Sequence, residues 1–259
     1  MPVEQIARGL WRVGGGSWNG TVDALSAEGD ANVYVLHEDS SAALIDCGTL
    51  EGRAQIEANV AETGAALTDL AELLLSHSHW DHSEAASHWQ TSLGLRTHLN
   101  ATGASFLANG DHRLVGYQTF GPGYGFEPFA VHHAIADGET FALAGVPMTT
   151  RFLPGHTPDS TLFTFERDGR RLGLCGDIAF GSKADGDTAL GLLSLLWLSN
   201  LDAYVESLAK LAAMEIDVLI PGHGGVVNGR DNVRTAVEST VRMARRLAED
   251  PAVRVNLGI

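Results

Sequence analysis

Cysteine and basic side chains are both scarce in this sequence of 259 residues. The two cysteines, Cys47 and Cys175, each lie in an apolar run typical of a buried strand. This pattern argues against a disulfide framework and a cysteine-based zinc site, and it predicts reduced thiols in the core. Lysine and arginine together number 17 against 32 acidic residues, which gives a formal charge of −15. Because that charge repels phosphate backbones, we expect no nucleic-acid partner.

The sequence also lacks a hydrophobic run long enough to cross a bilayer. Its longest apolar stretch, ALGLLSLLWL at 189–198, is about half of the roughly 20 residues that a transmembrane helix needs. The first residues, MPVEQIARGLWRV, contain neither an apolar segment after a basic start nor a small-residue cleavage site. We therefore expect a cytoplasmic location and no membrane partner. Hydrophobic residues at 44% and charged residues at 19% are typical of a compact globular protein.

Short apolar runs recur along the chain and alternate with segments of helical spacing. The runs that predict strands are 32–39, 42–48, 71–79, 148–156, 161–166, 171–177 and 217–223. Helical spacing predicts helices over 201–211, where Ser199 and Asp202 form a capping pair, and over 233–244. No Pro- or Ser-rich linker divides the chain. The sequence thus predicts the mixed α/β class and a single domain over residues 1–259.

Two loops are rich in glycine and aromatic residues, GGGSWNG at 14–20 and GYQTFGPGYGFEPF at 116–129. Such loops are either mobile flaps that present apolar surface or ordinary surface connections. Together with the apolar stretch at 189–198, they indicate either a partly hydrophobic pocket for a small-molecule substrate or a subunit interface. In the second case the chain is expected to form a homodimer.

Metal-ligand residues gather at the ends of several predicted strands. The stretch SHSHWDH at 76–82 holds three histidines and an aspartate, and His156, Asp177 and His223 each follow an apolar run and a glycine. Strand ends lie at one edge of a sheet, so loops leaving that edge can bring these side chains to one point. Five histidines and two carboxylates are therefore expected to meet there.

The spacing within SHSHWDH predicts two ions rather than one. In an extended segment alternate residues point the same way, so His77 and His79 can bind one ion while Asp81 and His82 turn toward another. Imidazole nitrogen and carboxylate oxygen suit zinc, iron or manganese. Metal pairs about 3.5–4 Å apart are a known hydrolytic arrangement.

These motifs resemble those of the metallo-β-lactamase-fold hydrolases. The hallmark His-x-His-x-Asp-His of that family is matched by residues 77–82, and PGHTPDS at 154–160, GD at 176–177 and PGHG at 221–224 resemble its later signatures in order and kind. The opening NVYVLHEDSSAALIDCG at 32–48 resembles the N-terminal strands of the family. The resemblance covers roughly residues 30–230.

The resemblance implies a four-layered αβ/βα sandwich with two mixed β-sheets flanked by helices, and with the metals at one edge of the sheets. By the same resemblance, two divalent metal ions are held, zinc first and iron or manganese as alternatives. The implied ligands are His77, His79 and His156 for the first ion, Asp81, His82 and His223 for the second, and Asp177 as the bridge.

This ligand set predicts a dinuclear-metal hydrolase that uses a metal-bridging hydroxide as its nucleophile. Asp81, beside the bridge, is the expected catalytic residue that orients the hydroxide and passes a proton to the leaving group. We expect the substrate to be a small, partly apolar ester, lactone or thioester, as for the glyoxalase II-like and lactonase-like branch. Lactonases of this fold often carry a tyrosine where this chain has Phe180.

Two other activities of the same fold stay open at this point. One is an iron-dependent oxidoreductase of the persulfide dioxygenase type, which uses one iron and so makes a complete second ligand set less expected. The other is hydrolysis of a β-lactam. Metal content and oxygen consumption discriminate the first from a hydrolase.

Overall fold

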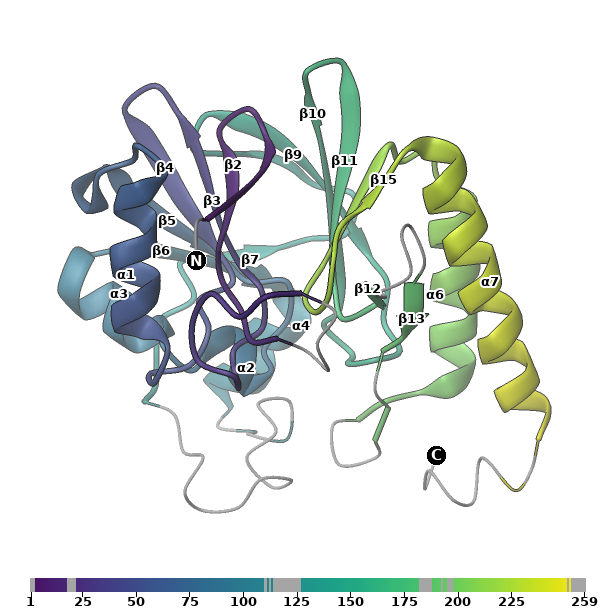
Figure 1. Ribbon diagram of the computed structural model, residues 1–259. Coiled ribbons are helices and arrows are strands. Elements are labelled where there is room, and N and C mark those ends of the chain that lie inside the picture. The colour runs from purple at the N-terminus through teal and green to yellow at the C-terminus, as the bar shows by residue number, and fades with distance from the viewer. Residues whose placement is uncertain are drawn as a thin grey trace.

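The computed structural model describes residues 3–17, 22–109, 111, 113, 127–181, 188–191, 193–194, 198–250 and 252. Two β-sheets pack face to face in the centre, and helices cover the outer face of each sheet (Figure 1). The helices α1 and α3 lie on one side, and α6 and α7 lie on the other. The predicted four-layered α/β sandwich is confirmed.

The first sheet has seven described strands in sequence order, antiparallel from β1 to β4 and parallel from β4 to β7. They are β1 (Glu4–Ala7), β2 (Leu10–Gly14), β3 (Val33–Glu38), β4 (Ser41–Ile45), β5 (Leu70–Leu74), β6 (Arg96–Asn100) and β7 (His133–Ile135). Its helices are α1 (Arg53–Glu62), the 3-10 turn η1 (Leu67–Asp69), α2 (Trp80–Ser83), α3 (Ala86–Leu93) and α4 (Ala101–Ala108).

The second sheet runs β15-β14-β11-β10-β9-β8, and β12 and β13 form a separate ribbon. Its strands are β8 (Thr140–Leu143), β9 (Val146–Phe152), β10 (Thr161–Arg167), β11 (Arg170–Gly176), β14 (Val218–Pro221) and β15 (Val227–Asn228), and the ribbon is β12 (Ala179–Gly181) with β13 (Thr188–Leu190). The helices α6 (Leu201–Ala212) and α7 (Arg230–Glu249) cover this sheet.

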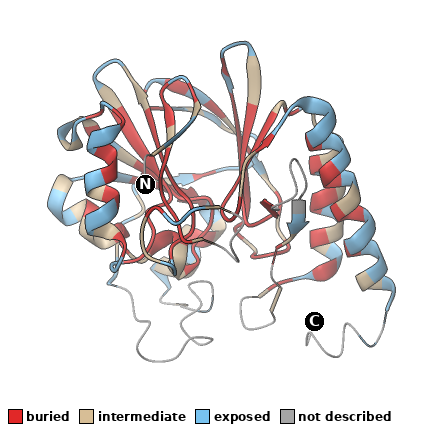
Figure 2. Cartoon of the chain, viewed as in Figure 1, coloured by how far each residue is buried: buried red, intermediate tan, exposed pale blue. Residues whose placement is uncertain are grey.

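Alternating side chains produce three separate hydrophobic layers. On β3, Tyr34 and Leu36 face the core between the sheets, while Val33 and Val35 face the core under α1 and α3. A third core lies between the second sheet and the apolar faces of α6 and α7, where Tyr204 and Val237 are fully buried. Buried residues accordingly line the inner sides of these helices, with exposed residues outside (Figure 2).

Two parallel strand pairs, one in each sheet, end at the same edge of the molecule. In the pair β4–β5, Asp46 follows β4 and Ser76 lies two residues after β5; in the pair β11–β14, Asp177 follows β11 and Gly222 follows β14. The backbone N–H of Gly222 donates to the carbonyl of Gly176 (2.8 Å), which holds the ends of β11 and β14 together. Both sheets therefore deliver polar residues to the same edge.

Several smaller predictions can be compared with the structure. Both cysteines are buried and free, as expected. The predicted cap of α6 is wrong by one residue, because the side chain of Asn200 caps the helix by accepting from the N–H of Ala203 (2.9 Å). Ser199 instead donates its hydroxyl to the carbonyl of His156 (2.6 Å). Among the described helices, none has the length and apolarity that a membrane crossing requires.

The apolar loops predicted from the sequence lie partly outside the described residues. This applies to residues 18–20 of the first loop, to 116–126 of the second loop, and to residues 192 and 195–197 of the apolar stretch. Their expected roles as flaps, pocket walls or an interface stay predictions.

Candidate metal centre

The SHSHWDH segment changes conformation in its middle. After β5 ends at Leu74, the chain bends at Ser76 and His77 and is extended at His79, whose φ of −61° and ψ of 147° precede the single turn of α2. The rings of His77 and His79 lie together, with centroids 4.7 Å apart, and the helical turn carries Asp81 and His82.

All seven predicted residues come together at the sheet edge and form two groups that share Asp177. The first group is His77, His79, His156 and Asp177, and the second group is Asp81, His82, Asp177 and His223. In each group the candidate ligand atoms all lie within 4.8 Å of one another. Six of the seven residues are buried, and Asp81 is partly exposed. Their role as metal ligands remains a proposal that is taken up below.

Asp177 lies in the middle of the cluster. Its Oδ2 atom is 3.5 Å from Nε2 of His156 and 3.5 Å from Nε2 of His223, so one oxygen faces a histidine of each group. Its Oδ1 atom is 3.3 Å from Nε2 of His82. In the first group, Nε2 of His156 is also 3.0 Å from Nδ1 of His79. In the second group, Oδ2 of Asp81 is 3.1 Å from Nε2 of His223.

The donor atoms in the cluster fit divalent cations. The Nε2 atoms of His77 and His82 and the Oδ1 atom of Asp177 are buried and make no hydrogen bond of good geometry within the described residues. Burying such atoms without a partner is costly, and nitrogen and carboxylate oxygen are the donors that zinc and related ions take. The cluster and the fold together indicate that the chain binds divalent metal.

Asp46 was not among the residues predicted from the sequence. It is hydrogen-bonded to His82 of the second group directly and to His77 of the first group through Ser76. Its Oδ2 accepts from Nδ1–H of His82 (2.8 Å) and from the hydroxyl of Ser76 (2.9 Å), and its Oδ1 accepts from the N–H of Ser76 (2.8 Å). The Ser76 oxygen in turn lies 3.1 Å from Nδ1 of His77. This network assigns the proton of both histidines to Nδ1 and leaves each Nε2 lone pair toward the cluster. The available signal was the position of Asp46 directly after a strand.

We expect Asp46→Asn to lower the affinity for one zinc ion by about 10- to 100-fold. An asparagine that keeps the Ser76 N–H bond turns an NH₂ group toward His82, so the proton of that ring must move to Nε2 and block the lone pair. Zinc titration against a competing chelator measures the effect. Asp69→Asn, on the partly exposed η1, is the control. Unchanged affinity for both ions would show that Asp46 has no such role.

The two groups differ in the direction in which the pKa values of their histidines are shifted. Burial lowers the pKa of His77 well below its usual value and that of His79 to about 3, and neighbouring imidazoles act in the same direction. Burial also acts to lower the pKa of His223, but the carboxylates of Asp177 and Asp81 outweigh it and raise that pKa to about 9. Because metal ligands must be deprotonated, an ion entering the second group competes with protons there.

Glycine contacts bring the His223 loop close to the cluster. A Cβ at Gly222 would lie 2.4 Å from Oδ1 of Asp177, and a Cβ at Gly181 would lie 2.0 Å from the carbonyl oxygen of Gly225. The ring of Phe180, on the same ribbon, lies edge-on to His223 with centroids 5.0 Å apart. These positions leave no room for a side chain, so the loop and the ribbon fix His223 by direct backbone contact.

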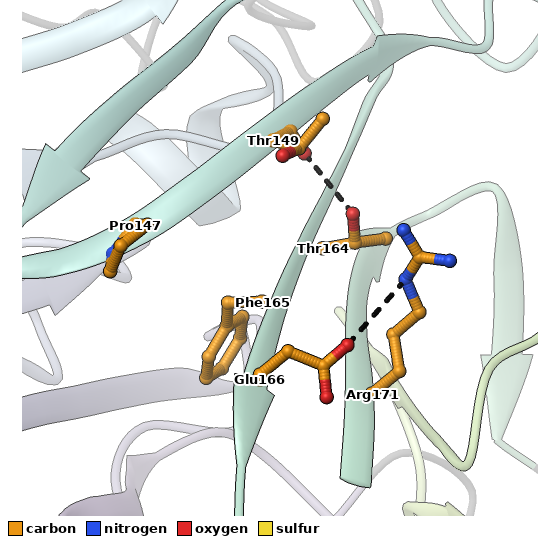
Figure 3. A pocket seen from close by; sticks show the side chains of 6 residues that line it. All are labelled: Pro147, Thr149, Thr164, Phe165, Glu166 and Arg171. Carbon is orange, nitrogen blue, oxygen red and sulfur yellow. Dashed lines mark hydrogen bonds and ion pairs between the residues drawn. The ribbon is translucent and has the colours of Figure 1, made fainter. Parts of the chain in front are cut away.

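A separate groove of ≈ 230 Å³ lies on β9, β10 and β11 (Figure 3). Its lining includes Thr149, Thr164, Glu166 and Arg171, and none of the seven cluster residues. Arg171 stands near the start of β11, whereas Asp177 follows the end of that strand. The groove is therefore remote from the cluster.

The chain belongs to the metallo-beta-lactamase superfamily, whose profile matches residues 27–223. Among solved structures it is similar to a mutant metallo-beta-lactamase from Cronobacter sakazakii, with a TM-score of 0.73, 21% identity, and coverage of 97% of this chain and 99% of that one. It is also similar to the metallo-beta-lactamase GOB-18 from Elizabethkingia meningoseptica, with a TM-score of 0.73, 18% identity, and coverage of 96% and 93%. At these identities the two structures support the fold alone.

Two curated relatives are fungal proteins. The chain is 26% identical over 218 residues to an atrochrysone carboxyl ACP thioesterase of Aspergillus fumigatus, with 83% of this chain and 58% of that protein covered. It is 26% identical over 200 residues to thioesterase pkgB of Emericella nidulans, with 76% and 46% covered. The chain therefore spans about half the length of these relatives. Family membership confirms the predicted resemblance and supports the prediction of a metal-dependent hydrolase.

Proposed function

We propose that this chain is a dinuclear-metal hydrolase that cleaves a thioester of a small, partly apolar acyl substrate. The observation that carries the proposal is the convergence of seven ligand-type side chains in two groups that share Asp177. Two ions bound a few ångströms apart are suited to activating a water and polarising a carbonyl at the same time. Esters and lactones belong to the same class of carbonyl substrate and are the next candidates.

We propose zinc as the metal, because the donor set consists of imidazole nitrogens and carboxylate oxygens. The two thiols do not join the set. The Sγ of Cys47 lies 3.2 Å from the carbonyl oxygen of His82, and that of Cys175 lies 3.6 Å from the carbonyl oxygen of Ala179. Burial raises the pKa of both thiols, which keeps them protonated and unsuited to metal binding at neutral pH.

The thioester is favoured within the class because both curated relatives are named as thioesterases. Chemistry supports the same choice. A thiolate has a conjugate-acid pKa of about 8.5, so it leaves with little help from a protein acid. The cluster offers one partly exposed carboxylate, Asp81, as a proton donor to a leaving group.

When bound, the two ions would lower the pKa of a shared water from ~15.7 toward ~7 and would withdraw electrons from the substrate carbonyl. Asp81 would orient the attacking water through its carboxylate and accept its proton. Oδ2 of Asp81 lies 3.1 Å from Nε2 of His223, so the carboxylate is held in one position. Asp177 and the buried histidines would fix the positions of the ions and exclude bulk water from the floor of the site.

A substrate panel tests the proposal. We expect zinc-loaded protein to cleave acyl thioesters, with slower turnover of aryl esters and lactones and none of β-lactams or phosphodiesters. His79→Ala is the matched control, because it removes one ligand of the first group. Asp81→Asn is expected to slow the hydrolysis of alkyl esters more than that of thioesters, because an alkoxide leaving group must be protonated as it leaves. The proposal fails if wild type and His79→Ala do not differ on any substrate.

Metal analysis discriminates the oxidoreductase alternative. About two zinc ions per chain and cleavage under anaerobic conditions support the hydrolase. One iron per chain, with oxygen consumed in the presence of a persulfide, would overturn the hydrolase proposal and indicate a dioxygenase.

A further inference from the structure

Ser78 separates the two histidines that open the metal cluster, and its side chain takes the opposite direction. The partner of its hydroxyl is Asp159, which belongs to neither group of the cluster. Ser78 is fully buried, and its hydroxyl donates to Oδ2 of Asp159 (2.7 Å). The N–H of Ser78 donates to the same oxygen (3.0 Å).

Asp159 belongs to the loop that carries His156, the remaining histidine of the first group. It is fully buried, and its backbone carbonyl accepts from the hydroxyl of Thr161 (2.9 Å), whose own N–H donates to the carbonyl of Ser76 (3.2 Å). The loop of residues 153–160, together with Thr161 at the start of β10, is therefore attached to the histidine segment at two points. One of them is the pair of bonds that a single carboxylate oxygen accepts from Ser78.

We propose that Asp159 is a positioning residue that fixes the spacing between the His77–His79 pair and His156. Within the described part of the chain it is hydrogen-bonded to Ser78 and Thr161 and to no candidate ligand atom, so it acts through Ser78 on one side and through its own loop on the other. The inference rests on the proposed metal centre, and it assigns Asp159 to the ion of the first group only. Asp46, by contrast, bonds His82 directly and reaches His77 through Ser76.

Helix α4 lies against Asp159 at Gly103. A Cβ at Gly103, in the first turn of α4, would lie 2.4 Å from Oδ2 of Asp159. This is the oxygen that accepts both bonds from Ser78. Gly103 has ordinary helical geometry, so the close approach, and no unusual backbone angle, is what requires a glycine there. The helix thus confines the carboxylate to the position from which it holds Ser78.

The test is a zinc titration with a competing chelator on full-length Asp159→Ala, Asp159→Asn and Gly103→Ala proteins. We expect Asp159→Ala to lower the affinity for one of the two ions by about 10- to 100-fold and to leave the other within about threefold. Asp159→Asn keeps an oxygen that can accept both bonds, so it is expected to restore most of the affinity. Gly103→Ala should lower the affinity for the same ion, although alanine is otherwise the better helix residue. Ser105→Ala, exposed on α4, is the control.

The visible spectrum of the cobalt-loaded proteins gives a second measurement that is independent of activity. A changed coordination geometry in Asp159→Ala and Gly103→Ala, with the wild-type spectrum in Asp159→Asn, supports the inference. An equal loss of both ions, or no loss, overturns it. If Asp159→Ala does not fold, Ser78→Ala decides, because it removes one of the two bonds and must weaken the same ion. Two bound zinc ions without any turnover would end the proposed activity and leave this inference standing.

Discussion

Asp177→Asn is expected to lose at least about a thousandfold in turnover, together with most of the bound metal. Among the residues that the structure describes, Asp177 alone belongs to both groups, and its two oxygens lie 3.3–3.5 Å from histidines of each. Asparagine has nearly the same shape, but it removes the negative charge between two cations and turns an NH₂ group toward one of them. Metal content by elemental analysis and steady-state kinetics on a thioester measure the two effects.

Asp217→Asn is the matched control for this variant. Asp217 precedes β14, the strand next to β11. It pairs with Arg230 at 2.8 Å and accepts from the N–H of Arg171, and neither partner belongs to the cluster. We expect that variant to keep two ions and full turnover. If Asp177→Asn retained both ions and wild-type rates, Asp177 would not be a shared ligand and the two-ion proposal would be wrong.

The seven cluster positions could be read from the sequence because each follows an apolar strand run. Parallel neighbours end at the same edge of a sheet, so the order of strands alone brings Asp177 beside the His223 loop. The spacing of the motif likewise predicted that His77 and His79 fall in one group and Asp81 and His82 in the other, whereas the helical turn of α2 was not predicted. Local pattern and fold therefore agree at this site.

The supporting residues could not be read in the same way. Asp46 bonds a histidine 36 residues further along, and Asp159 bonds a serine 81 residues before it. An aspartate after a strand or a proline is equally typical of a turn or a helix cap, so the residue type alone does not choose a partner. These bonds exist only once β4, β5 and the loop before β10 are packed.

Tertiary contact also decided the start of α6. The sequence offers two adjacent capping residues, Ser199 and Asn200, and either can accept from the first turn of a helix. The hydroxyl of Ser199 donates to the carbonyl of His156, and its oxygen accepts from the N–H of Ser194 (3.0 Å), so the cap falls to Asn200. The capping residue therefore differs from the predicted one by one position, while the helix begins at Leu201 as predicted.

Gly222→Ala is expected to reduce turnover by about a hundredfold or more, because displacements near 1 Å at a reacting centre have effects of that size. The added methyl would lie 2.4 Å from Oδ1 of Asp177 and 2.7 Å from Cε1 of His82, well inside normal contact distances. Gly222 has no positive φ, so alanine strains nothing except these contacts. Zinc affinity and thioester turnover should fall together, with the ion of the second group lost first.

Gly173→Ala separates this effect from a general cost of adding a methyl to a buried strand. Gly173 lies on β11, and a Cβ there would meet the Cδ1 end of Ile216 at 3.0 Å, which a side-chain adjustment can relieve. We expect that variant to bind two ions and turn over normally, with a modest change in melting temperature. Should Gly222→Ala bind both ions as tightly as Gly173→Ala does, a methyl against His82 and Asp177 would not disturb the second ion. His82 and Asp177 would then not be ligands of that ion, and the proposed second group would be wrong.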